Sequence, residues 1–226
     1  MAKLAQFVGI DGMPASGKTT FFDALHLALE SRGVKVVGAK GDKWLSRAAD
    51  NYINELEDMF DCSSHDYPTV EDFLNNKFFT SKNPSKRLGF MGIVRNQFDK
   101  DMFFLREALA QGYCPNEILD LMVGEKSKPD IILRELITLN LSESWQESFN
   151  IVMLIDEEIR RRRSKARCSV RDLIPGQEEM WFGLYNPIIN ENIKCDEFVR
   201  NDEDDKDGVI MEQKAIYIAD KIIERL

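Results

Sequence analysis

The sequence predicts a single α/β domain over residues 1–226, in which a parallel sheet of five strands is covered by helices on both faces. Its 226 residues suit one domain of ordinary size, and 43% hydrophobic residues are enough for a sizeable core. Short apolar runs alternate with stretches of helical periodicity, which is typical of a mostly parallel sheet. A glycine-containing motif lies between the first strand and the first helix, and it gives the domain its chemistry.

The first half of the chain is predicted to open with a strand, a loop, a helix and a second strand. Residues 5–10 and 34–39 are short, apolar and β-branched, and residues 19–31 between them have helical spacing. Residues 42–79 are polar and acidic, so we expect short helices and loops there. A long helix is predicted over residues 84–111, because its apolar side chains recur every three or four residues: Leu88, Met91, Val94, Phe98, Met102, Leu105 and Leu109.

The second half continues the alternation of strands and helices. Strands are predicted over residues 117–123, 149–155 and 195–199. Helices are predicted over residues 129–140, 156–171, 178–191 and 209–226. The five strands of the whole chain would then form one sheet, with each connecting helix on one of its faces.

Composition excludes several classes of protein. The net charge of −9 has the wrong sign for a protein that coats nucleic acid or an anionic membrane. The longest apolar runs are far shorter than a membrane-spanning helix, and no charged-then-apolar leader opens the chain, so we expect a cytoplasmic protein. Four scattered cysteines and two histidines favour free thiols over a zinc site or a disulfide framework.

Residues 12–19, GMPASGKT, match the phosphate-binding pattern GxxxxGK[ST] without a mismatch. The glycines allow backbone N–H groups to surround phosphate oxygens, and the following helix adds the positive end of its dipole. Lys18 would reach the β- and γ-phosphates, and the Thr19 hydroxyl would hold Mg²⁺. The sequence therefore predicts ATP and Mg²⁺ as ligands. The predicted contacts are Gly12, Ala15, Ser16, Gly17, Lys18, Thr19 and Thr20.

A strongly basic segment follows the predicted fourth strand. Its seven cations within residues 160–171 are Arg160, Arg161, Arg162, Arg163, Lys165, Arg167 and Arg171. Arg163 and Arg167 lie four residues apart on one helix face, where like charges repel unless an anion lies opposite. This clustering of cations is explained if residues 160–176 form a lid that closes on ATP. Arg163 and Arg167 would then bind the transferred phosphoryl group. The alternative is a solvated surface helix paired with acids.

The chain resembles the deoxynucleoside kinase and thymidylate kinase family of P-loop kinases. Residues 8–20 are similar to the first strand and loop of that family, and the arginine-rich segment occupies the position of its lid. Residues 42–44, 95–97 and 125–127 are similar to three further motifs of the family. The resemblance spans nearly the whole chain and implies a three-layer P-loop kinase fold.

The resemblance also implies roles for single residues. Asp42 would be the general base, although Ala39 and Lys40 stand where the family carries a Glu-Pro pair; the alternative for Asp42 is a turn residue. Three residues would bind the acceptor: Trp44 next to that base, Arg95 through a phosphate, and Lys126. Glu125 would support Mg²⁺ through water, with Lys126 in the place of the family's arginine. Asp120 competes with Glu125 for the magnesium role.

Together these features predict ATP-dependent phosphoryl transfer to a small acceptor. The resemblance implies a (deoxy)nucleoside or a (deoxy)nucleoside monophosphate as acceptor. The alternatives are a non-catalytic nucleotide-binding subunit and a P-loop kinase with an unusual acceptor. A polymer acceptor such as DNA is disfavoured by the net charge, and a signalling GTPase by the lack of an NKxD-like signature. The resemblance implies a homodimer through the helix over residues 84–111, whose apolar face could equally be core.

Overall fold

A computed structural model describes residues 4–81, 83–124, 126, 128–136, 139–142, 145–146, 148–166, 193–202 and 208–226. The strands of these residues form one six-stranded sheet, and their order across it is β3 (Val123–Gly124), β2 (Val36–Lys40), β4 (Ile131–Glu135), β1 (Gln6–Gly12), β5 (Ser148–Leu154) and β6 (Glu197–Arg200). Five of the strands run parallel, and β3 is antiparallel to β2. A parallel sheet of five strands is thus present as expected, with one short antiparallel strand at its edge, but one of the five, Ile131–Glu135, lies where a helix was predicted.

The elements follow one another in the alternation expected of an α/β fold. The α-helices are α1 (Lys18–Glu30), α2 (Trp44–Asn51), α3 (Ile53–Phe60), α4 (Val70–Phe73), α5 (Pro84–Ala110), α6 (Asn116–Leu119), α7 (Glu157–Ala166) and α9 (Val209–Ile223). The 3₁₀ segments are Gly41–Lys43, Ser64–Asp66 and Leu139–Leu141, and a π-helical turn covers Leu74–Phe78.

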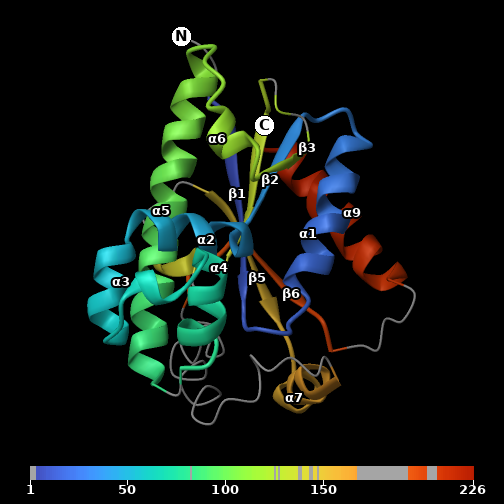
Figure 1. The fold of residues 1–226 in the computed structure, drawn as a ribbon. Helices are drawn as coiled ribbons and strands as arrows, with labels where there is room; N and C mark the ends of the chain where they lie inside the picture. Colours follow the sequence, from blue (N-terminus) through green and yellow to red (C-terminus); the bar gives the residue numbers. More distant parts are fainter. Residues whose placement is uncertain are drawn as a thin grey trace.

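Helices cover both faces of the sheet (Figure 1). On one face α1 and α9 pack on Val8, Ile10 and Leu133; on the other, α5 and the shorter helices pack on Phe7 and Ile132. The alternation along β1 and β4 produces this division, because successive side chains of a strand point to opposite faces. All but Leu88 of the apolar residues predicted for the long helix are buried, so this stripe of α5 belongs to the core. No helix of the described residues is long and apolar enough to span a membrane.

The helix predicted over residues 129–140 is wrong, because its first part is the strand β4. Residues Ile131 to Leu133 are fully buried and lie between β1 and β2. A short apolar run after a proline fits the start of a helix and a buried strand equally well, and only pairing partners distinguish the two. Both neighbours are supplied by distant parts of the chain, so the local sequence could not decide.

The strand predicted over residues 117–123 is also wrong. Residues Asn116–Leu119 form the single turn of α6, which buries Ile118 and Leu119, and only Val123–Gly124 pairs with β2. The buried residues of this segment are three or four apart, which is a helical spacing, and the short apolar alternation was misleading. The described part of the basic helix, Glu157–Ala166, agrees with the prediction, whereas residues 167–192, including the predicted helix over 178–191, lie outside the described residues.

A buried carboxylate joins α2 to α5. Asp101 is 5% exposed and accepts hydrogen bonds from Trp44 Nε1 at 2.9 Å and from Gln97 Nε2 at 2.8 Å. Arg47 Nε adds an ion pair at 2.6 Å. A buried carboxylate is stable only when its oxygens are hydrogen-bonded, and these donors provide that. The network fixes the helix that follows β2 against the long helix on the same face of the sheet.

We predict that Asp101→Ala lowers the free energy of unfolding by about 2–3 kcal/mol, because it leaves the Trp44 and Gln97 donors buried without an acceptor. Urea denaturation followed by circular dichroism would measure the change. Asp50→Ala, which removes an exposed carboxylate from α2, serves as the control and is expected to stay within about 0.5 kcal/mol. Equal losses for the two variants would contradict the role given to Asp101.

Candidate functional site: the phosphate-binding loop and its carboxylate

The loop between β1 and α1 has the backbone of a phosphate cradle. Gly12 and Gly17 have φ of +150° and +93°, and Ala15 has a φ of +65°. A side chain at Gly12 would also come within 2.7 Å of the Met153 carbonyl oxygen on β5, so this position is closed to other residues on two grounds. Gly17 is the N-cap of α1, whose first N–H groups and dipole face the loop. The predicted strand, loop and helix are confirmed.

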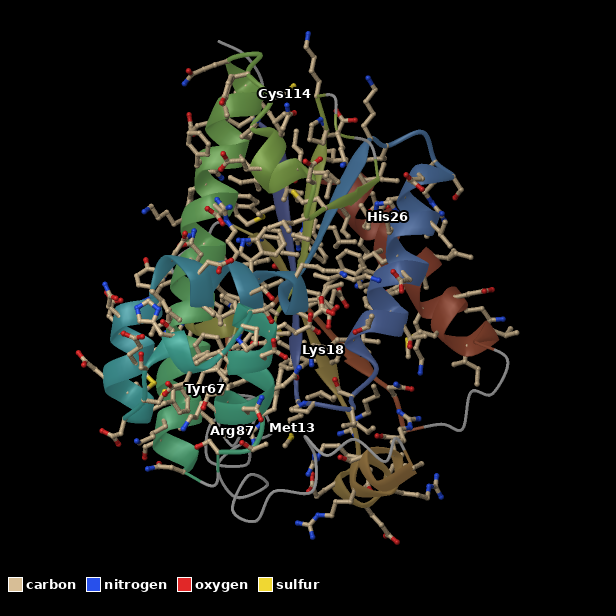
Figure 2. All side chains as sticks on the ribbon, in the orientation of Figure 1. Met13, Lys18, His26, Tyr67, Arg87 and Cys114 are labelled. Carbon is tan, nitrogen blue, oxygen red and sulfur yellow. The ribbon has the colours of Figure 1, made fainter. Side chains whose placement is uncertain are left out.

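Lys18 folds back over this loop. Its side chain is 6% exposed, and Nζ donates to the carbonyl oxygens of Gly12 at 2.8 Å and Met13 at 3.0 Å. Figure 2 shows Met13 and Lys18 at the end of the sheet where β1 turns into α1, far from Cys114 at the other end. An ammonium group that donates to carbonyl oxygens keeps its positive charge, and phosphate oxygens would replace those carbonyls.

The hydroxyl group of Thr19 lies beside a carboxylate that the sequence analysis did not identify. Thr19 Oγ1 donates to Glu135 Oε1 at 3.0 Å, across 116 positions in the sequence. Glu135 is the last residue of β4, and its neighbours in the sheet are Ile10 on β1 and Lys40 on β2. The carboxyl end of the central strands therefore places one carboxylate against the first turn of α1.

Burial raises the pKa of Glu135 above its ordinary value, because the charged form loses contact with water. The positive charge of Lys18 and the hydrogen bond from Thr19 oppose this shift, and the negative charge of Asp42 adds to it. Glu135 is therefore a half-buried carboxylate of raised pKa that lies beside the Thr19 hydroxyl and near the Lys18 charge. Such groups are common at functional sites.

Asp42 and Asp11 lie at the same edge of the sheet as Glu135. Asp42 is exposed on the 3₁₀ turn that follows β2, close enough to Glu135 for their charges to interact. Asp11 is fully buried, and its oxygens accept from the Gly12 N–H at 2.6 Å and from the Asn140 N–H at 2.8 Å. Asp11 therefore braces the start of the loop, whereas Asp42 is open to a ligand.

Trp44 does not line a binding surface, which corrects the prediction that it contacts the acceptor. The ring is fully buried, packs edge-to-face on Phe98 at 4.9 Å, and uses its N–H on Asp101. Burial of an indole ring against an apolar helix removes a large apolar area from water, so this ring is part of the hydrophobic core. Phe78 and Phe90 are buried in the same way and lie 4.6 Å apart.

Lys126 and Asp120 also lie away from the loop. The strand β3 runs antiparallel to β2, so the chain leaves it toward the edge of the sheet opposite the loop, where the Asp130 and Lys35 backbones are hydrogen-bonded. Lys126 forms an ion pair with Asp120 at 3.8 Å there, and Asp120 is the C-cap of α6. The predicted substrate contact of Lys126 and the magnesium role considered for Asp120 are therefore both wrong: the antiparallel direction of β3 carries Lys126 away from the site, and the ion pair places Asp120 beside Lys126.

The structure describes three of the five remaining predicted residues. Arg163 is on α7, and its Nη2 donates to Asn201 Oδ1 at 3.5 Å, next to the loop. Arg95 is half-buried on α5, and its contact with an acceptor stays a prediction. Glu125 and Arg167 lie outside the described residues. Thr20 is exposed on the first turn of α1, adjacent to Thr19.

A signal for Glu135 was present in the sequence. Residues 131–133 are apolar and are followed by polar residues ending in an acid, which is the pattern that residues 7–11 show before the loop. The carboxyl ends of parallel strands meet at one edge of a sheet, so acids at the ends of two central strands come together. The helical interpretation of residues 129–140 hid this pattern.

Comparisons with known proteins support the fold. A structure titled TT1252 from Thermus thermophilus superposes with a TM-score of 0.57 at 16% identity, and 99% of each chain is covered. The dephospho-CoA kinase of Campylobacter jejuni gives a TM-score of 0.50 at 15% identity, covering 97% of this chain and 98% of that chain. No protein-family model and no curated protein matches the sequence. The likeness shows that this chain has an α/β fold of the P-loop kinase type.

We predict that Glu135→Gln makes the unliganded protein more stable at pH 7. Between the ordinary pKa of a glutamate and the raised pKa of Glu135, the folded state binds more protons than the unfolded chain, so wild-type stability falls as the pH rises through that window. Glutamine removes this loss while its amide oxygen still accepts from Thr19. Thermal denaturation between pH 4 and pH 8 would show a gap between variant and wild type that opens as the pH rises.

Glu55→Gln is the matched control, because Glu55 is exposed on α3 and far from the loop. Its melting temperature is expected to follow the wild type at each pH. A gap for Glu135→Gln that closes toward pH 8, or one of the same size for Glu55→Gln, would refute the assignment.

Proposed function

We propose that this protein transfers the γ-phosphoryl group of ATP to a small acceptor, and that the acceptor is a (deoxy)nucleoside or a (deoxy)nucleoside monophosphate. The observation that carries the proposal is the 3.0 Å hydrogen bond from Thr19 Oγ1 to Glu135 Oε1. It joins a hydroxyl of the phosphate-binding loop to a carboxylate on the strand next to β1. A loop that only bound phosphate would not need this carboxylate.

The oxygen ligands at this site are of the kind that Mg²⁺ prefers. Thr19 Oγ1 and the Glu135 carboxylate are hard oxygen ligands, and Mg²⁺ in kinase sites uses one or two such groups together with phosphates and waters. The described residues contain no cluster of three His, Cys, Asp or Glu side chains that could hold a metal by themselves, which a phosphate-bound ion does not require. When bound, Mg²⁺ neutralises charge on the β- and γ-phosphates.

The residues of the chain then have distinct tasks. Loop N–H groups and the N-terminus of α1 hold the phosphates, and Lys18 leaves the Gly12 and Met13 carbonyls to bind the β- and γ-oxygens. The Glu135 carboxylate would hold Mg²⁺ beside Thr19, directly or through water. Arg163 approaches from α7 and stabilises the charge on the transferred group, as a guanidinium does in a site closed to water.

The position of Asp42 favours an acceptor that reacts through a hydroxyl group. It is exposed, acidic and close enough to Glu135 for the two charges to interact, so it can accept a proton from an acceptor bound in front of the loop. Arg95 supports the alternative in which the acceptor already carries a phosphate, since a guanidinium binds phosphate through two hydrogen bonds. The nucleoside class itself rests on the resemblance of residues 42–44 and 95–97 to the deoxynucleoside and thymidylate kinases.

We predict that wild-type protein with ATP and Mg²⁺ releases ADP in the presence of one member of a panel of nucleosides and monophosphates. Lys18→Ala is expected to reduce that rate at least about 100-fold, because it removes the charge that the transition state requires. A coupled ADP-release assay measures both proteins, and Lys43→Ala, at an exposed lysine next to Asp42, is the control for a lost positive charge. Binding of ATP without transfer to any member of the panel would refute the proposal and favour a non-catalytic subunit or an unusual acceptor.

A second prediction distinguishes the two acceptor levels. For a nucleoside, Asp42→Asn is expected to reduce kcat about 100-fold or more, leaving the KM for ATP nearly unchanged, because only the base is lost. For a monophosphate, Arg95→Ala is expected to raise the KM for the acceptor, with a small effect of Asp42→Asn. Steady-state kinetics of both variants with the active acceptor decide between a nucleoside and a monophosphate. Wild-type kcat and KM in both variants would exclude both residues from the site.

A further inference from the structure

The segment that follows β6 lies directly behind the phosphate-binding loop. Asn201 is 6% exposed, and its backbone N–H donates to the Leu154 carbonyl oxygen at 2.9 Å, which extends the pairing of β6 with β5. Its side chain points to the loop, where Nδ2 donates to the Ser16 carbonyl oxygen at 2.8 Å. A Cβ atom on Gly17 would lie 2.2 Å from that Nδ2. The loop is therefore seated on the Asn201 amide, and glycine is required at position 17.

This contact controls the direction of a loop N–H group. The peptide bond between Ser16 and Gly17 is planar and trans, so its C=O and N–H point in opposite directions. Because Asn201 holds the Ser16 carbonyl on the outside of the loop, the Gly17 N–H points to the inside, where phosphate would bind. The amide thus acts on the donor geometry without touching the nucleotide.

The other end of the same amide faces the arginine-rich helix. Asn201 Oδ1 accepts from Arg163 Nη2 at 3.5 Å. The Ser16 carbonyl can only accept and the guanidinium can only donate, so an amide, with one donor end and one acceptor end, satisfies both partners. Neither aspartate nor leucine at position 201 could do so.

The next residue fixes the start of α7. Asp202 Oδ1 accepts from the Asp156 backbone N–H at 2.6 Å, and Asp156 Oδ1 in turn accepts from the N–H groups of Glu158 and Ile159 at 2.9 and 3.3 Å. Asp156 is thus the cap of α7, and the residue after Asn201 holds that cap in place. Two adjacent side chains connect the loop, the cap of α7 and Arg163.

We infer that Asn201 is a positioning residue that couples α7 to the phosphate-binding loop: it orients the Ser16–Gly17 peptide for the nucleotide phosphates and places Arg163 beside it. The inference rests on the proposed function only in taking a nucleotide as the ligand of the loop. A change in α7 is transmitted to the loop through one amide, and nucleotide binding is transmitted back to α7 through the same group.

The test measures MgADP binding by isothermal titration calorimetry, which needs no acceptor. Asn201→Ala is expected to weaken MgADP about fivefold, the value of one hydrogen bond. Asn201→Asp is expected to weaken it more, because a carboxylate would face the Ser16 carbonyl and add negative charge near the phosphates. Val199→Ala, two residues earlier on β6 and also buried, is the control: its melting temperature falls while its affinity for MgADP stays that of the wild type.

The coupling to α7 is tested by a double-mutant cycle. Arg163→Gln combined with Asn201→Ala is expected to weaken MgADP by less than the product of the two single effects, because both variants break one chain of contacts. Steady-state kinetics of Asn201→Ala should show a raised KM for ATP with a smaller change in kcat. Three results would overturn the inference. The first is wild-type affinity for MgADP in both Asn201 variants, and the second is strictly multiplicative effects in the cycle. The third is a loss of MgADP affinity no larger than that of Val199→Ala.

The outcomes separate the inference from the proposed function. Wild-type protein that binds MgADP but transfers phosphate to no acceptor refutes the kinase proposal, and the Asn201 variants still decide the inference by calorimetry. Wild-type protein that does not bind MgADP overturns both.

Discussion

The parallel pairing of β1 with β4 is the contact on which the whole site depends. Its register sets Glu135 opposite Ile10. Ile10 is followed by Asp11 and then by Gly12, the first residue of the loop. That register places the Glu135 carboxylate within hydrogen-bonding distance of Thr19, and the pairing of β2 on the other side of β4 brings the Asp42 turn to the same edge. A slip of one residue would turn Glu135 to the opposite face of the sheet, because side chains alternate along a strand.

The same strand carries a buried charge on its other face. Arg134 is fully buried, with its guanidinium 4.0 Å above the Phe7 ring and 3.8 Å from Asp99 on α5. Arg106 covers Phe7 as well, at 4.4 Å. Burying a guanidinium is costly unless it is paired, and the aromatic face and the carboxylate offset that cost. Adjacent residues of β4 thus serve different purposes: Arg134 holds α5 to the sheet, and Glu135 serves the loop.

Charged groups in the interior are concentrated where the sheet meets the loop. Asp11, Lys18 and Glu135 are all largely removed from water, and each depends on a backbone or side-chain partner from another element. Such an arrangement reduces stability in the absence of a ligand, and ligand binding recovers the lost free energy. The Asn201 amide adds to this arrangement, since it holds the Ser16 carbonyl of the loop against the residue that follows β6.

The sequence by itself determined the local parts of this protein. The pattern GMPASGKT, the apolar strand before it and the helical stripe of α5 are encoded by neighbouring residues, and each was predicted at its observed place. Which elements become neighbours was decided only by the tertiary structure. The run Ile131–Glu135 is a strand because β1 and β2 lie on either side of it, Trp44 is core because Asp101 lies 57 positions away to receive its N–H, and Asn201 reaches a loop 185 positions earlier. Short apolar runs and single polar residues carry no information about distant partners, so their roles emerge only when the sheet brings those partners together.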